Sequence, residues 1–126
     1  MHVALVVPDR ELWSGEARTV IAKTTEGDIG VLTGHAPMFG ILAEGSVTQI
    51  LTEDSEVRAA ISGGFLSVTD DRISILAAQA QLGGEVDIEE ARQELAAALA
   101  EAVPGAEDSP AVRYTRARLR AAGDQA

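Results

Sequence analysis

The chain has 126 residues, which suits one compact domain with at most a small appendage. Twenty acidic against ten basic side chains give a net charge of −10, which argues against direct binding to nucleic acid or anionic lipid, since both are polyanions. There is no cysteine, which excludes a disulfide framework, a thiolate metal site and a cysteine nucleophile. No apolar run approaches the roughly 20 residues of a membrane-spanning helix. If the protein works at a membrane, we expect a partner protein to hold it there.

Short β-rich runs separated by turns fill the first two thirds of the chain. They lie at residues 3–7, 20–22, 29–32, 38–42, 46–52, 57–61, 65–68 and 73–76. Gly63 and Gly64 are expected to end one strand before the next begins at Phe65. Strands of this length with frequent turns predict a mainly β fold, an antiparallel β-sandwich of about ten strands.

The composition changes sharply after Gly84, where glycine becomes scarce and alanine abundant. Asp87 is a suitable N-cap for one helix, and Ser109 followed by Pro110 is a suitable start for another. We therefore predict a β-sandwich domain over residues 1–84 and a helical hairpin over residues 85–126, with helices at about 87–103 and 110–122.

Charge is sorted between the two predicted helices. Residues 85–108 carry eight acidic side chains and one arginine, whereas residues 113–120 carry four arginines and no acid. Two interpretations stay open: either both charged faces are simply solvated, or the basic helix leaves its neighbour for another acidic surface. The apolar stripe of the second helix depends on Val112 and Leu119, which predicts only marginal docking.

No catalytic constellation is evident in the sequence. The two histidines, His2 and His35, have no partner at metal-ligand spacing, and no serine lies in a Gly-x-Ser-x-Gly elbow. We therefore expect a protein that is not an enzyme on its own and that needs no cofactor. His35 has two interpretations, a corner histidine bonded to the backbone or a ring presented to a partner.

Three segments in a fixed order carry a resemblance to a known family. They are LWSGEA at residues 12–17, EGDIGVLTGHAP at 26–37, and SGGFLSV at 62–68 followed by RISILA at 72–77. With the two-helix tail behind them, they resemble the epsilon subunit of bacterial F-type ATP synthases. The resemblance covers nearly the whole chain.

This resemblance implies a non-catalytic rotor subunit of the central stalk in a proton-translocating ATP synthase. The sandwich would link the gamma subunit to the ring of c subunits, and the hairpin would regulate ATP hydrolysis, with the catalytic alpha and beta subunits as a further contact. It also implies a peripheral position on the cytoplasmic face of the bacterial cell membrane. The alternative is a stand-alone β-sandwich module that binds a small ligand or a protein.

The resemblance also assigns roles to particular residues. An acidic turn would face the c ring, and the segment after the Gly-His-Ala-Pro corner would face gamma, although strand alternation should send Met38 or Phe39 into the sandwich. Three arginines of the second helix would form the regulatory surface. These residues are Glu26, Gly27 and Asp28 for the c ring, His35, Met38, Phe39 and Gly40 for gamma, and Arg113, Arg116 and Arg120 for regulation.

Some bacterial members of the family bind ATP on the hairpin through an Ile/Leu-Asp-x-x-Arg-Ala motif. The nearest match here would use Glu89 and Arg92, but a glutamate replaces the aspartate and Gln93 replaces the alanine. The sequence therefore leaves ATP binding open. The second helix is also short, which predicts weak inhibition of ATP hydrolysis.

Overall fold

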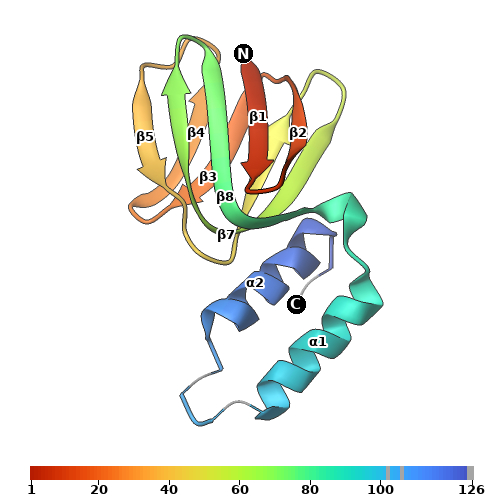
Figure 1. Cartoon of the computed structure of the whole chain (residues 1–126). Helices are drawn as coiled ribbons and strands as arrows, with labels where there is room; N and C mark the ends of the chain where they lie inside the picture. The colour runs from red at the N-terminus through yellow and green to blue at the C-terminus, as the bar shows by residue number, and fades with distance from the viewer. Residues whose placement is uncertain (102, 106, 125–126) are drawn as a thin grey trace.

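The computed structural model describes residues 1–101, 103–105 and 107–124. Figure 1 shows a β-sandwich with a helical hairpin attached below it. The strands are β1 (His2–Val7), β2 (Arg10–Glu16), β3 (Thr19–Thr24), β4 (Gly27–Leu32), β5 (Met38–Ile41), β6 (Ser46–Leu51), β7 (Glu56–Thr69) and β8 (Arg72–Leu82). They are followed by a short 3-10 turn η1 (Gly83–Glu85) and by the helices α1 (Ile88–Glu101) and α2 (Pro110–Ala121).

The long strand β7 belongs to both layers of the sandwich. Its first half pairs with β6, its second half pairs with β5, and β8 runs antiparallel beside it from Ala59 to Thr69. The hydrogen-bonded strand order is β2-β1-β8-β7-β6-β3-β4, with β5 attached to β7 off this path. β7 therefore passes from one layer to the other.

Gly63 and Gly64 make this passage possible. Both have positive φ, and a Cβ at Gly64 would lie 2.2 Å from the carbonyl oxygen of Leu76 on β8. The backbone bends at these two residues, yet the β7–β8 register is the same before and after them. The pair therefore bends a single strand and does not separate two strands.

The prediction of a mainly β sandwich followed by two helices is confirmed. The described residues contain eight strands where the sequence indicated about ten. Runs 57–61 and 65–68, predicted as two strands, belong to one strand. One pairing also differs from a purely antiparallel sandwich, because β1 runs parallel to β8.

Alternating side chains of the strands form one apolar core. In β1 every second residue is buried, and the same alternation appears in β3, β6 and β8. The largest fully buried members come from several strands and include Leu5, Ile50, Ile61, Leu66, Ile73 and Ile75. Among the described residues, this core contains none beyond Leu82, so the described parts of the helices do not belong to it.

The helices begin where the sequence indicates. The Asp87 carboxylate accepts a hydrogen bond from the Glu90 backbone N–H (3.1 Å), and the Ser109 hydroxyl accepts one from Val112 (3.3 Å), with Pro110 at the first helical position. Beyond α2, Gly123 adopts positive φ (90°) as a helix-ending residue.

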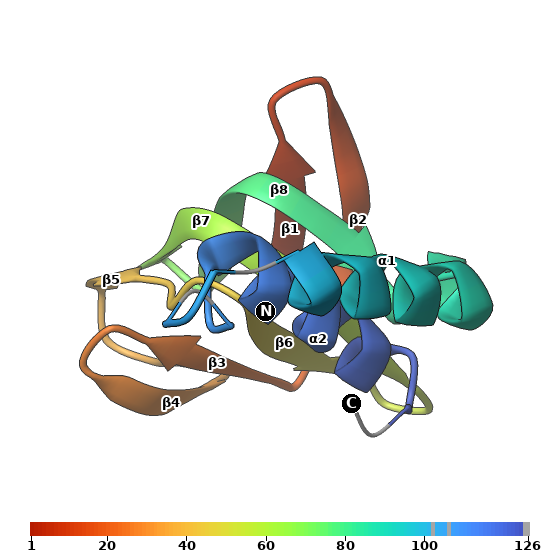
Figure 2. The same cartoon turned by 90° about the horizontal axis from the view of Figure 1, so that it is seen from below.

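Helix α2 lies between the sandwich and α1. Figure 1 shows α2 nearer to the strands than α1, and Figure 2, seen from below, shows both helices crossing the end of the sandwich. A small apolar cluster joins α2 to the sheet, formed by Ala60, Ala117 and Ala121 with Val47 and Tyr114 beside them. α2 buries four side chains, Val112, Ala117, Leu119 and Ala121, which is more than the predicted two-residue stripe supplies.

Candidate interaction surfaces

The acidic turn joins β3 to β4 and is fixed by a buried threonine. The Thr24 hydroxyl donates to the carbonyl of Gly27 (2.7 Å) and accepts from the backbone N–H of Glu26 (3.2 Å). Gly27 has φ of 128°, which a residue with a side chain rarely adopts. Glu26, Gly27 and Asp28 are all exposed, so the turn presents two carboxylates on a rigid frame.

The corner between β4 and β5 is held by backbone contacts. Gly34 donates its backbone N–H to the Asp71 carboxylate (2.8 Å), which ties the corner to the β7–β8 turn. The His35 ring donates from Nδ1 to the neighbouring Ala36 carbonyl (2.6 Å), and its backbone N–H bonds to Leu32. His35 is therefore a corner histidine bonded to backbone, and its ring is partly exposed.

Met38 and Phe39 point to opposite sides of β5. Met38 is half-buried and packs against the sandwich core, while Phe39 is 63% exposed. The sequence left open which of these two side chains points into the sandwich. The methionine points inward and the phenylalanine points outward. Gly40, between Phe39 and Ile41, lies close to Thr24, since a Cβ there would be 3.3 Å from the Thr24 methyl.

Exposed apolar side chains form a row across three strands. Ile41 on β5 is the register partner of Phe65 on β7, and Phe65 is the partner of Leu76 on β8. All three are exposed, and the ring of Phe39 stacks at a tilt on that of Phe65 with centroids 5.1 Å apart. We call Phe39, Ile41, Phe65 and Leu76 the apolar row. A shallow hollow of about 560 Å³ continues it towards Pro8 and β1.

The acidic turn and strand β5 line one hollow of about 390 Å³. β5 pairs with β7 and not with β4, so the two strands face each other across this hollow. The end of β3 and the acidic turn are joined to the end of β5, where Thr25 donates to the Ile41 carbonyl and Ala43 to the Lys23 carbonyl, both at 2.9 Å. The structure thus brings together residues that the sequence assigned to two different partners.

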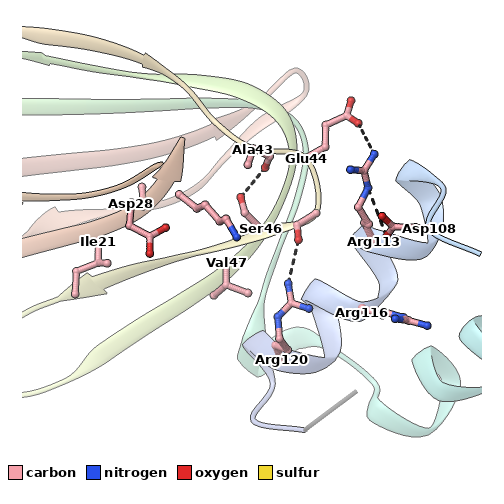
Figure 3. Close-up of a pocket in the computed structure, with 13 residues that line it drawn as sticks. Ile21, Asp28, Ala43, Glu44, Ser46, Val47, Asp108, Arg113, Arg116 and Arg120 are labelled. Carbon is pink, nitrogen blue, oxygen red and sulfur yellow. Dashed lines mark hydrogen bonds and ion pairs between the residues drawn. The ribbon is translucent and has the colours of Figure 1, made fainter. Parts of the chain in front are cut away.

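The three arginines predicted as a regulatory surface lie on α2 beside the sandwich. Together with residues of β3 and of the β5–β6 turn they line a hollow of about 570 Å³ (Figure 3). Arg113 lies 3.7 Å from Glu44 and 4.0 Å from Asp108, and Arg120 donates to the Gly45 carbonyl (3.0 Å). Arg116 points away from the strands in Figure 3, and its Nε has no hydrogen-bond partner among the described residues.

A fourth arginine, Arg118, makes the contacts that join three elements. Its Nε donates to Gln81 on β8 (2.7 Å) and its Nη1 donates to Glu94 on α1 (2.6 Å). Its side chain is only 13% exposed. The i, i+3, i+7 spacing selected the other three arginines and missed this one, because the spacing does not show which helical face meets α1.

Tyr114 lies beside the contact between α2 and the sheet. Burial raises the pKa of its phenol, and the nearby positive charge of Arg118 acts in the opposite direction. The neutral phenol is therefore the form that favours docking.

Arg92 and Asp124 form a two-pronged ion pair. Nε and Nη2 of Arg92 donate to the two carboxylate oxygens at 3.0 and 2.6 Å, and this hydrogen bond and charge raise the pKa of Arg92. One edge of the guanidinium is therefore occupied by a carboxylate of the chain itself, whereas Glu89 is exposed. The groups on this edge of Arg92 that would contact a phosphate are already used in this ion pair.

Among the described residues, no group of three or more histidine and acidic side chains is close enough to hold a metal ion. No helix in the described part of the chain is long and apolar enough to cross a membrane.

Known proteins resemble this chain in sequence. A family model described as ATP synthase, Delta/Epsilon chain, beta-sandwich domain, matches residues 1–83. The ATP synthase epsilon chain of Thermobifida fusca (strain YX) is 53% identical over 125 residues, which cover 97% of this chain and 91% of the relative. That of Streptomyces griseus is 47% identical over 121 residues, covering 96% and 94%.

Solved structures resemble it in fold. A chain of the mitochondrial ATP synthase of Euglena gracilis, in an OSCP/F1/c-ring assembly, superposes with a TM-score of 0.73 at 25% identity and covers 95% of this chain and 79% of that one. A chain from the central stalk and c-ring of the Tetrahymena thermophila enzyme, at 16% identity and a TM-score of 0.57, shares the fold. Sequence, sandwich and hairpin agree, and the chain belongs to the ATP synthase epsilon chain family.

Proposed function

We propose that this ATP synthase subunit works in the central stalk as part of the rotor, linking the gamma subunit to the c ring, and that its hairpin regulates ATP hydrolysis. The observation that carries this proposal is the adjacency of two unlike surfaces. Phe39 and Ile41 of the apolar row line the same hollow as the acidic turn, so one rigid sandwich can contact two partners at once.

The apolar row is the surface that we assign to gamma. Contiguous exposed apolar patches on folded proteins usually mark interaction sites, and aromatic side chains are enriched where such sites are buried. Phe39 and Ile41 are 63% and 56% exposed, which leaves a large apolar area for a partner to cover. His35 and Gly40 border this surface, and Met38 supports it from inside the sandwich.

The acidic turn is the surface that we assign to the c ring. Glu26 and Asp28 are exposed at the end of a hairpin whose backbone is fixed by Thr24. A rigid pair of carboxylates suits contact with polar or basic loops, since little entropy is lost when the contact forms. The two negative charges would orient the subunit on the c ring more than they would raise its affinity.

The hairpin is the part that we assign to regulation. α2 holds α1 to the sandwich through the Arg118 contacts, so release of α2 would free both helices together. Arg113, Arg116 and Arg120 would then become available to an acidic surface on another subunit, such as the alpha and beta subunits. Because Asp124 already occupies Arg92, we propose that ATP does not control this release.

We place the subunit at the cytoplasmic face of the bacterial membrane, as a peripheral component held by its partners. The acidic surface of the chain does not favour binding to anionic lipid by itself. Its attachment would therefore depend on the gamma and c subunits.

Capture from membranes tests the proposed function. Tagged full-length protein should recover gamma, the c ring and the catalytic subunits from detergent extracts of the source bacterium. The variant Phe39→Ala should recover less of them, and Leu32→Ala, which changes a similarly exposed side chain (60%) on β4, should behave as wild type. Recovery of unrelated proteins in place of ATP synthase subunits would instead support a stand-alone binding module.

A further inference from the structure

Two glycines lie directly against the backbone of α2. A Cβ at Gly83 would be 2.1 Å from the carbonyl oxygen of Ala121 and 2.7 Å from its carbonyl carbon. A Cβ at Gly45 would be 2.5 Å from the Cβ of Arg113 and 2.7 Å from its carbonyl carbon. Both ends of α2 therefore rest at positions where the sandwich has no side chain.

Between these ends the contact is made by small side chains. Ala117 and Ala121 of α2 pack on Ala60 of β7, and Ala60 and Ala117 are fully buried. Gly45 also fixes the helix through its carbonyl, which accepts from Arg120 (3.0 Å). The helix thus lies close to the sheet from the Gly45 contact at one end to the Gly83 contact at the other.

The two glycines differ in what their own backbone requires. Gly45 has φ of 67°, so a side chain there would strain the turn even without the helix. Gly83 is outside the positive-φ region, and the three described atoms nearest its Cβ position beyond its chain neighbours all belong to the end of α2. A side chain at Gly83 would therefore oppose docking of the helix without straining the sandwich.

We propose that Gly83 is the positioning residue that permits α2 to dock on the sandwich, with Gly45 as the matching contact at the other end. Because Gly83 has no side chain, α2 can lie at this short distance from the sandwich. This distance in turn sets the equilibrium between the docked and the released hairpin. This inference concerns the free chain, and it holds whether or not the hairpin regulates hydrolysis.

The full chain offers a matched pair of variants. Gly83→Ala adds the colliding methyl, whereas Gly84→Ala adds the same methyl one residue later, where nothing lies within 4 Å and φ is also outside the positive region. Amide exchange is followed separately over residues 110–121 and over β7 and β8. We expect Gly83→Ala to speed exchange across α2 by roughly tenfold or more, as overpacking shifts a local opening equilibrium by such factors. Exchange in β7 and β8 should speed up by no larger a factor than in α2, since only the contact on Ala60 is lost there, and Gly84→Ala should match wild type.

Three results would overturn the proposal. One is wild-type protection of α2 in Gly83→Ala, and another is equal loss of protection in both variants, which would indicate a general effect of alanine in η1. The third is a wild-type α2 that exchanges as fast as an undocked helix. If Gly83→Ala does not fold, Ala117→Leu decides instead, since it overfills the same contact from the helix side and leaves the sandwich sequence unchanged. If α2 then keeps its protection from amide exchange in Ala117→Leu, the helix does not depend on close contact with the sheet.

Discussion

Phe39 and Phe65 stack on the outer face of the sandwich with ring centroids 5.1 Å apart and an angle of 31° between the rings. They are far apart in the sequence and meet because β5 pairs with the second half of β7. An exposed aromatic pair of this kind is stabilised little by its own contact. Its larger effect is to present a continuous apolar surface to a partner.

The first prediction concerns this aromatic pair. Phe39→Ala should weaken binding of gamma by roughly 10- to 100-fold, equivalent to about 1–3 kcal/mol, which is typical of a central aromatic contact. The melting temperature of the isolated chain should change little, since Phe39 is mostly exposed. Titration calorimetry with purified gamma measures the first quantity. If Phe39→Ala binds gamma as tightly as the wild type and the control Leu32→Ala do, gamma does not bind this face.

The second prediction concerns the acidic turn. Asp28→Lys should weaken coupling between proton flow and ATP synthesis in the reconstituted enzyme, because it reverses a charge at the surface assigned to the c ring. The isolated fold should keep its stability within about 0.5 kcal/mol, as is usual for an exposed turn. Glu53→Lys makes the same charge reversal at the exposed β6–β7 turn and should leave coupling intact. If Asp28→Lys melts the isolated chain, the residue has a structural role and not the assigned one.

The third prediction concerns the boundary between sandwich and hairpin. A chain ending at Gly84 should fold by itself, because no residue beyond Leu82 belongs to the sandwich core. Uncovering Ala60 and part of Val47 should cost roughly 1–2 kcal/mol and lower the melting temperature by roughly 5–15 °C. Circular dichroism and two-dimensional NMR test this directly. An unfolded product would show that the hairpin is required for folding.

The fourth prediction uses the single tyrosine as a probe of docking. Burial raises the pKa of Tyr114 above the ordinary value of about 10, so the docked state favours the neutral phenol. This contribution to stability is fully present below pH 10 and is lost as the pH rises through the higher pKa of the docked state. Spectrophotometric titration should therefore show a raised midpoint in wild type and a midpoint near 10 in Gly83→Ala. The same midpoint in both chains would show that Tyr114 does not report docking.

The fifth prediction concerns regulation by α2. Truncation after Gly105 removes this helix and should raise ATP hydrolysis by the assembled enzyme only slightly, while ATP synthesis stays largely intact. The reason is its length, since 12 residues extend only about 18 Å and reach little of a neighbouring subunit. Steady-state hydrolysis by enzymes with full and truncated chains measures the effect. A rise of an order of magnitude would show strong inhibition.

The sequence by itself determined the elements and their order. Turn glycines, strand alternation and the caps at Asp87 and Ser109 act over a few residues, so their effect can be predicted without knowledge of the fold. The motifs around residues 26–37 and 62–77 also identified the family. The resemblance to that family, and not a local pattern, assigned the acidic turn to an interface.

Only the tertiary structure decided which distant residues meet. Strand pairing aligned Ile41, Phe65 and Leu76 into one row, and continuous pairing with β8 kept β7 a single strand across Gly63 and Gly64. The face that α2 turns to the sheet selected Arg118 as the joining arginine and placed Gly83 under the helix end. These contacts depend on register and on helix orientation. Both are set by the packing of the whole chain, and no local pattern records them.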